Sequence, residues 1–111
     1  MLSEPLLFRA TPAAQSPLRP AADFQFWRTE RLHIEWPAKG PLDRREAKLL
    51  GRDGRTLQVP VNLTERVQAG QPVLAADLNL APLAPGDYVI EVKVAIGAEE
   101  TLRYIPVRVV R

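Results

Sequence analysis

The residues that could support catalysis are few in this sequence and lie far apart. His33 is the only histidine, Ser3 and Ser16 are the only serines, and cysteine is absent. A covalent hydrolase needs a nucleophile with a general base beside it, and both serines precede the patterned part of the chain. His33 alternates with apolar neighbours, so we expect it to point outward from a strand as a surface residue. The sequence therefore predicts no enzyme activity.

The same inventory argues against a metal site or a cofactor. Zinc sites need three or four soft or imidazole ligands, which one histidine without any cysteine does not supply. Calcium loops need closely spaced oxygen ligands, whereas Asp53-Gly54 lies between Arg52 and Arg55, which repel a cation. Neither familiar glycine-rich phosphate motif is present. We expect no metal and no cofactor.

Charged residues are interleaved along the chain. The 15 basic residues oppose 13 acidic ones, which gives a formal net charge of +2. Nucleic-acid modules usually gather positive charge on one face beside stacking aromatics, and here the alternating pattern scatters the basic side chains. No apolar run has the length of a transmembrane helix, and the first residues show no signal-peptide pattern. We expect neither nucleic-acid binding nor a membrane span.

The clearest structural pattern lies at residues 83–96, where a turn runs directly into an alternating strand. Pro85 presets φ and Gly86 permits a positive φ, so the chain can reverse sharply there. Every second residue from Tyr88 to Ile96 is aromatic or apolar, so these side chains share one face. A tyrosine after such a turn matches the tyrosine corner of immunoglobulin-like sandwiches. An ordinary strand aromatic is the alternative, and we assign Pro85, Gly86 and Tyr88 structural roles.

Short alternating segments separated by turn signals follow one another from residue 23. Asp53-Gly54 favours a hairpin turn, and Pro60 places its strand at an edge or bulge because proline donates no backbone hydrogen bond. We expect seven strands, at 24–26, 32–36, 46–50, 57–63, 73–80, 88–96 and 104–109. This spacing is typical of a sandwich or barrel. The prediction is an all-β, immunoglobulin-like or fibronectin-type-III-like antiparallel sandwich.

The first 22 residues have a different composition. Residues 5–9 predict a short edge strand or the end of a preceding module's last strand. Residues 10–22 hold three prolines among alanines, which favours extended chain. We therefore divide the chain into residues 1–22, an edge strand with a Pro/Ala-rich linker, and residues 23–111, the sandwich. An irregular edge packed along the sandwich is the alternative for residues 10–22.

Two tryptophans and two loops are the candidates for binding. Trp36 shares the face of Leu32 and Ile34, which makes it a core candidate, whereas Trp27 adjoins a polar corner. The loops at 38–40 and 52–54 have the least structural explanation. Our candidate contact residues are Trp27, Lys39, Arg52 and Asp53. We expect a protein partner, with a carbohydrate stacked on Trp27 and Tyr104 as the alternative, and the sequence sets no oligomeric state.

The run from residue 24 to residue 111 resembles a known family. The segments that carry the resemblance are 26–32, 49–54, 76–83 and 85–88. They are similar to the C-terminal β-sandwich of the VWFA-related proteins of acidobacteria, exported proteins in which a von Willebrand factor A-like domain precedes immunoglobulin-like modules. The metal-binding Asp-x-Ser-x-Ser signature of the A-like domain is absent here, so no functional residue transfers.

What this resemblance implies is a context. The chain would be a non-catalytic accessory module for protein contact or spacing in a larger exported bacterial protein. Its location would then be periplasmic, cell-surface or extracellular. An accessory domain of a secreted hydrolase is an alternative from another class of function.

Overall fold

The computed structural model describes residues 5–10, 18–21, 24–38 and 42–110. These residues hold ten strands and no helix: β1 (Leu6–Ala10), β2 (Arg19–Pro20), β3 (Gln25–Trp27), β4 (Arg31–Pro37), β5 (Arg44–Leu50), β6 (Thr56–Leu57), β7 (Asn62–Gln68), β8 (Gln71–Asn79), β9 (Gly86–Ile96) and β10 (Glu99–Val110). The all-β prediction is confirmed.

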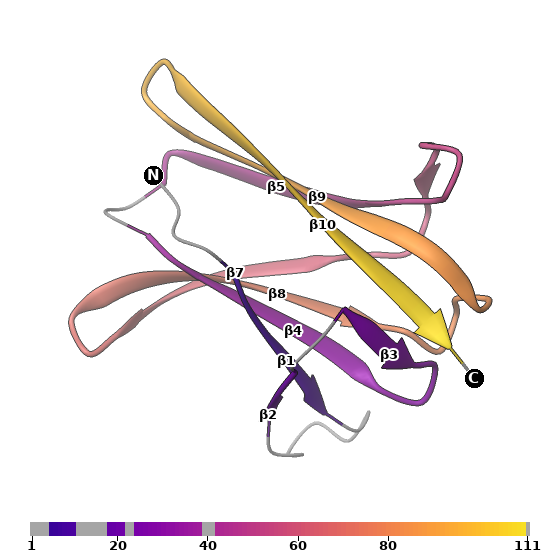
Figure 1. Cartoon of the computed structure of the whole chain (residues 1–111). Helices are drawn as coiled ribbons and strands as arrows, with labels where there is room; N and C mark the ends of the chain where they lie inside the picture. The colour runs from indigo at the N-terminus through magenta and orange to yellow at the C-terminus, as the bar shows by residue number, and fades with distance from the viewer. Residues whose placement is uncertain (1–4, 11–17, 22–23, 39–41, 111) are drawn as a thin grey trace.

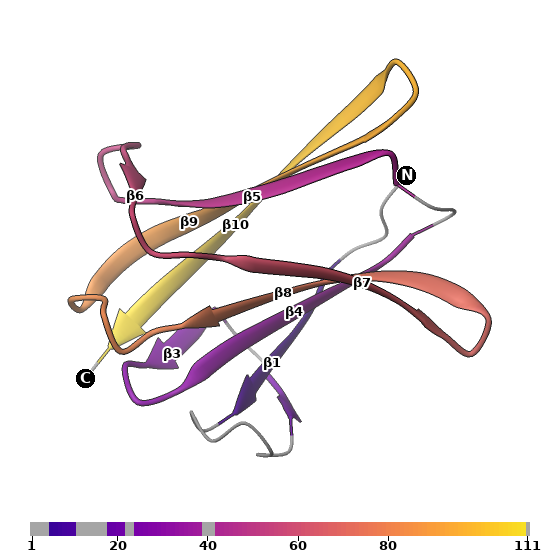
Figure 2. The ribbon, with the colours of Figure 1, turned by 180° about the vertical axis from the view of Figure 1, so that it is seen from behind.

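The strands form two sheets of five strands each. Sheet I has the order β2-β1-β4-β8-β7, and sheet II has the order β3-β10-β9-β5-β6. All neighbours are antiparallel except β3, which runs parallel to the end of β10. Figures 1 and 2 show the sheets as two facing layers. The arrangement is sandwich-like.

The inner faces of the two sheets share one apolar core. Side chains alternate between the two faces of a strand, and every second residue of the long strands is apolar. Sheet I contributes Leu32, Ile34, Trp36, Leu74, Ala76 and Leu78, and sheet II contributes Leu49, Ile90, Val92, Val94, Ile105, Val107 and Val109. Because a sheet with one apolar face must cover it, this pattern brings the sheets together. Trp36 lies in the core, as the sequence predicts.

Residues 57–63 do not form the single strand that alternation predicts. β6 ends at Leu57 in sheet II, and β7 begins at Asn62 in sheet I. Pro60 lies in the connection between them. Since proline cannot donate to a ladder, the chain leaves sheet II there and crosses to sheet I.

Tight turns close the two long hairpins, β7–β8 and β9–β10. Ala69 and Gly70 join β7 to β8 with φ values of 53° and 78°. Two successive positive φ values match the twist of the flanking strands. Gly97, at φ 58°, begins the turn between β9 and β10. These turns fix the register of each hairpin.

The described parts of the N-terminal segment belong to sheet I. The strand predicted at residues 5–9 is present as β1. It does not lie at the edge of the sheet, because it pairs with β4 along its whole length on one side and with β2 on the other. Ala10, at the end of β1, is buried. The linker assigned to residues 10–22 stays a prediction, because residues 11–17 and 22 lie outside the described residues.

The substitution Ile90→Asp tests the shared core. Ile90 is fully buried on β9, and an unpaired carboxylate there has neither water nor a partner. We expect the free energy of unfolding to fall by about 4 kcal/mol or more, measured by urea denaturation. Val67→Asp on β7 is the matched control, because Val67 is 72% exposed. Equal stability of the two variants would contradict the assigned inner face.

Candidate binding surface

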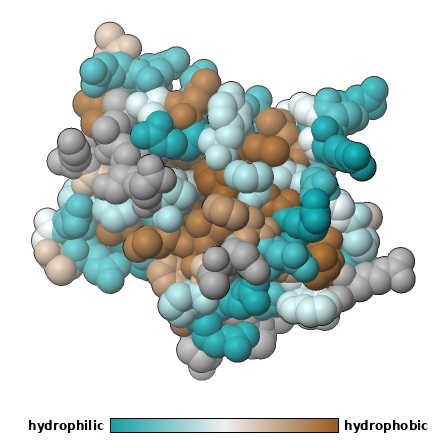
Figure 3. All heavy atoms as spheres, in the orientation of Figure 1, coloured by the Kyte–Doolittle hydropathy of each residue, from teal (hydrophilic) through white to brown (hydrophobic). Residues whose placement is uncertain are grey.

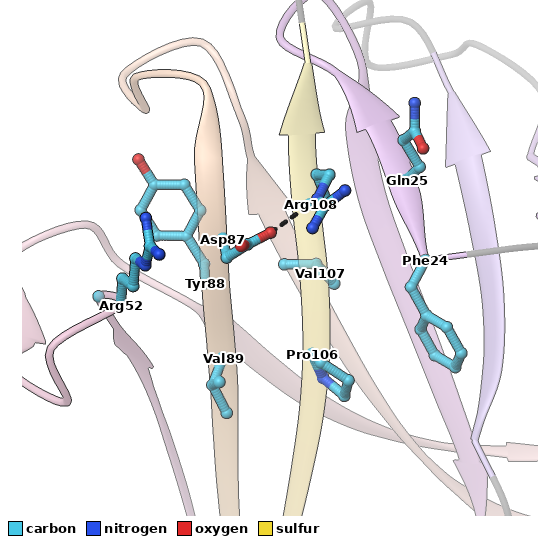
Figure 4. Close-up of a pocket in the computed structure, with 10 residues that line it drawn as sticks. Phe24, Gln25, Arg52, Asp87, Tyr88, Val89, Pro106, Val107 and Arg108 are labelled. Carbon is cyan, nitrogen blue, oxygen red and sulfur yellow. Dashed lines mark hydrogen bonds and ion pairs between the residues drawn. The ribbon is translucent and has the colours of Figure 1, made fainter.

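A groove of about 430 Å³ crosses the outer face of sheet II. Its residues come from β9 and β10, from the start of β3 and from the turn after β5 (Figure 4). Val89 and Pro106 are register partners on β9 and β10 and both line the groove. Phe24 lies on the β3 side and Arg52 on the opposite side. The groove therefore has an apolar centre between an aromatic ring and a cation.

An ion pair crosses the two strands beside this apolar centre. Arg108 Nε donates to Asp87 Oδ1 at 2.8 Å, and the two residues are register partners. The hydrogen bond from Arg108 lowers the pKa of Asp87, with a smaller effect from the charge of Arg52, and Asp87 raises the pKa of Arg108. Because both side chains are exposed, solvent screens the pair and it adds little stability. With Arg52, this end of the groove holds two cations and one anion.

The predicted contact residues do not all lie at one surface. Arg52 lines the groove. Asp53 lies in the same turn, where its Oδ1 accepts the backbone N–H of Arg55 at 3.0 Å. Trp27 is exposed at the end of β3 and does not line the groove. Lys39 lies outside the described residues, so the contact roles of all four stay predictions.

The two aromatics proposed to stack on a sugar are far apart along sheet II. Trp27 pairs in register with Val110, whereas Tyr104 lies six residues earlier on β10. Six residues of strand span about 20 Å. Trp27 and Tyr104 therefore do not form one stacking platform.

Sequence reasoning missed Phe24 as a surface residue. In the strand expected at 24–26, Phe24 and Phe26 would share one face, yet Phe26 is fully buried and Phe24 is exposed. The strand β3 begins only at Gln25, so the alternation does not extend to Phe24. The backbone oxygen of Phe24 accepts the N–H of Arg108 at 2.8 Å, which holds the ring beside the groove.

Tyr88 ties the start of β9 to the connection that precedes it. Its hydroxyl donates to the backbone oxygen of Ala84 at 2.6 Å, and the ring packs against the core. Pro85 and Gly86 lie within the three-residue segment that this hydrogen bond spans. The bond to upstream backbone that defines a tyrosine corner is therefore present.

A network of charged side chains covers part of the outer face of sheet I. His33 Nδ1 lies 2.7 Å from Asp77 Oδ1, and Nε2 lies 2.8 Å from Glu35 Oε2. Arg66 of β7 pairs with the same oxygen of Glu35, and the ring of Phe8 lies beside the imidazole. The prediction of a solvent-exposed His33 is wrong, since it is only 5% exposed. It does point away from the core, and its neighbours on both sides cover it.

Both nitrogens of His33 face carboxylate oxygens, which favours the imidazolium because only that form donates from both positions. The hydrogen bond to Asp77 raises the pKa of His33, burial opposes the rise, and the hydrogen bond to Glu35 adds to it. Within the described residues, no group of three or more histidine, aspartate or glutamate side chains is arranged to hold a metal ion. The contacts of this network join β4 to β8 and β7.

A second apolar depression opens on the side where β1 and β10 lie. Figure 3 shows apolar atoms gathered across the middle of this side, between more polar margins. A cleft of about 500 Å³ there is lined by Pro5, Phe24, Trp36, Arg103, Tyr104, Ile105 and Pro106. The indole N–H of the buried Trp36 has no hydrogen-bond acceptor in the described structure.

Comparisons with known proteins leave the family open. The chain matches no protein-family model, and neither a curated protein nor a solved structure matches it. The resemblance to VWFA-related proteins therefore stays a prediction. The described segments contain no helix that could cross a membrane.

The charge network predicts a specific dependence of stability on pH. The pKa of His33 is raised above its ordinary value of 6.5, so its contribution is fully present below the unfolded-state pKa and is lost as pH rises through the folded-state pKa. We expect the free energy of unfolding, measured by urea denaturation, to fall over that window. The substitution His33→Gln should remove this decrease of the free energy of unfolding with pH. A parent stability that rises over the same window, with no change in the variant, would contradict the charged state of His33.

The substitution Tyr88→Phe tests the tyrosine corner. It removes the hydroxyl that donates to Ala84 and leaves the ring. We expect a loss of about 1 kcal/mol in the free energy of unfolding, measured by urea denaturation. Tyr104→Phe is the control, because the Tyr104 ring is exposed on the same sheet. If both substitutions have the same effect, the hydrogen bond to Ala84 does not stabilise the corner.

Proposed function

We propose that this chain is an immunoglobulin-like, non-catalytic module that contacts another protein. The strand order supports the fold assignment. In immunoglobulin sandwiches, strands A, B, E and D form one sheet and strands C, F and G the other. β1, β4, β8 and β7 lie in the first order, and β5, β9 and β10 take the places of C, F and G. Tyr88 then stands near the start of strand F, where a tyrosine corner belongs.

The groove on sheet II carries the proposal of protein contact. Val89 and Pro106 give it an apolar centre, and Phe24 adds an exposed ring. The guanidinium of Arg52 borders it. Apolar area beside a positively charged rim suits a protein surface that presents an apolar side chain with a carboxylate nearby.

The wider context rests on the sequence resemblance alone. VWFA-related proteins are exported and carry immunoglobulin-like modules as accessory domains, so we place this chain in a larger exported bacterial protein. A sugar-binding role has less support, because Trp27 and Tyr104 are too far apart to stack on one ring. An accessory domain of a secreted hydrolase would use the same fold, and the neighbouring coding sequence distinguishes the two contexts.

A capture experiment with groove variants tests the proposal. The immobilised chain is exposed to an extract of the source cells, and bound proteins are crosslinked and identified. Val89→Glu places a carboxylate in the centre of the groove, whereas Thr64→Glu places one at an exposed position of β7 in sheet I. We expect the parent and Thr64→Glu to retain one common partner and Val89→Glu to lose it.

Two outcomes would contradict this function. Capture of the same proteins by all three forms would remove the groove as the contact surface. Failure to capture a protein, together with binding on a glycan array, would favour the carbohydrate alternative.

A further inference from the structure

β10 has a long open edge within the described structure. It pairs with β9 along residues 99–109. On its other side, β3 pairs only with residues 108–110. Residues 99–107 therefore have a neighbouring strand on one side only, among the residues that the structure describes.

The direction of the backbone groups along β10 follows from two hydrogen bonds to the β3 side. The Arg108 N–H donates to Phe24 at 2.8 Å, and the Val110 oxygen accepts the N–H of Arg28 at 3.0 Å. Backbone groups of successive strand residues alternate in direction, so Glu100, Leu102 and Tyr104 also direct their N–H and C=O groups away from β9. Pro106 also directs its backbone away from β9. Its missing N–H is therefore not one that the ladder between β9 and β10 would use.

The side chains at this edge protect it poorly against pairing. Leu102 is 44% exposed and Tyr104 is 57% exposed. The carboxylate of Glu100 lies 3.8 Å from Lys93 and 4.0 Å from Arg44 of its own chain. Natural edges are usually guarded by unpaired charges, prolines or short strands. Here Leu102 and Tyr104 are the two outward-facing residues between Glu100 and Pro106.

We propose that this edge pairs with the same edge of a second copy of the chain, antiparallel and about a two-fold axis at Leu102. Leu102 then lies opposite Leu102 of the second copy, and Glu100 lies opposite Tyr104. Glu100, Leu102 and Tyr104 of each chain are then paired, which gives about six backbone hydrogen bonds. The two sheets II become one continuous sheet.

The residues at this edge favour that register over the two registers with the axis one residue away. An axis at Arg103 would place Arg103 directly opposite Arg103 of the second copy, and like charges in that position are destabilising. It would also place Pro106 opposite Glu100. An axis at Thr101 would leave Tyr104 without a strand partner. With the axis at Leu102, the residue opposite Arg103 is Thr101.

Among the residues that the structure describes, no strand covers this edge between residues 99 and 107. Figures 1 and 2 show the hairpin of β9 and β10 extending away from sheet I toward its turn. In the proposed register, the turn of the second copy, at residues 97–98, lies opposite Pro106. That position adjoins the apolar cleft lined by Pro106 and Trp36.

Sedimentation of the intact chain over a range of concentrations is the first test. We expect a concentration-dependent dimer, and Leu102→Pro should raise its dissociation constant about tenfold or more by removing two hydrogen bonds. The substitution leaves the β9 ladder intact, as Pro106 does, so the melting temperature of the monomer should change little. A parent that stays monomeric at all concentrations, or a dimer unchanged by Leu102→Pro, would overturn the proposal.

A charge exchange tests the register without proline. Leu102→Lys and Leu102→Asp each place like charges opposite one another at the two-fold axis, so each variant alone should be monomeric. An equimolar mixture should form a heterodimer. If the mixture dimerises no better than either variant alone, Leu102 does not lie on the axis.

Single cysteines distinguish the β10 edge from the β7 edge. The chain has no cysteine, so Leu102→Cys and Val67→Cys each report on one position. We expect a disulfide-linked dimer from Leu102→Cys and none from Val67→Cys on the β7 edge. The reverse result would assign the interface to β7. The groove variant Val89→Glu should still dimerise, which separates this proposal from the protein contact proposed above.

Discussion

The period of two along β10 determines three different surfaces of this molecule. Ile105 and the alternate residues after it point inward and fill the core with sheet I. Pro106 and Arg108 point outward and line the groove. The same alternation acts on the backbone, because residues with outward side chains direct their N–H and C=O groups away from β9. A shift of one residue in the pairing of β9 and β10 would exchange core and groove together.

The parts of this fold that the sequence predicts are those that depend on alternation alone. The inward faces of β4, β8, β9 and β10 follow from apolar residues at every second position, and hairpin turns follow from glycine and Asp-Gly signals. The crossing at Pro60 was missed because Leu57 to Leu63 alternates through it. Local alternation does not reveal that a chain changes sheets between two residues that both face the same core.

The candidate surface was less predictable than the fold, for a physical reason. Arg52 was identified from its loop, but the groove depends on Val89 and Pro106, which only the register of β9 and β10 brings together. Phe24 reaches the groove because β3 begins one residue later than its pattern indicates. Such positions depend on pairing between distant segments, which a single sequence does not specify.

The charge network on sheet I depends on the register of its strands. His33 on β4 and Asp77 on β8 are register partners, and Arg66 on β7 reaches Glu35 from the next strand. Burying charges costs desolvation energy that their attraction only partly returns. Removing one member of a buried ion pair nevertheless lowers stability, since it leaves the other charge uncompensated. A slipped register of these central strands would separate His33 from Asp77, so the network favours one alignment of sheet I.

The parallel pairing of β3 with β10 has a consequence for how the chain acquires its structure. Residues 25–27 pair with residues 108–110, so two segments near opposite ends of the chain must meet. Contacts between distant segments slow folding, because the loop entropy is lost before the contact forms. During synthesis, β3 leaves the ribosome long before its partner exists. Sheet II is therefore completed only after translation of its last strand, and until then β3 lacks the strand with which it pairs.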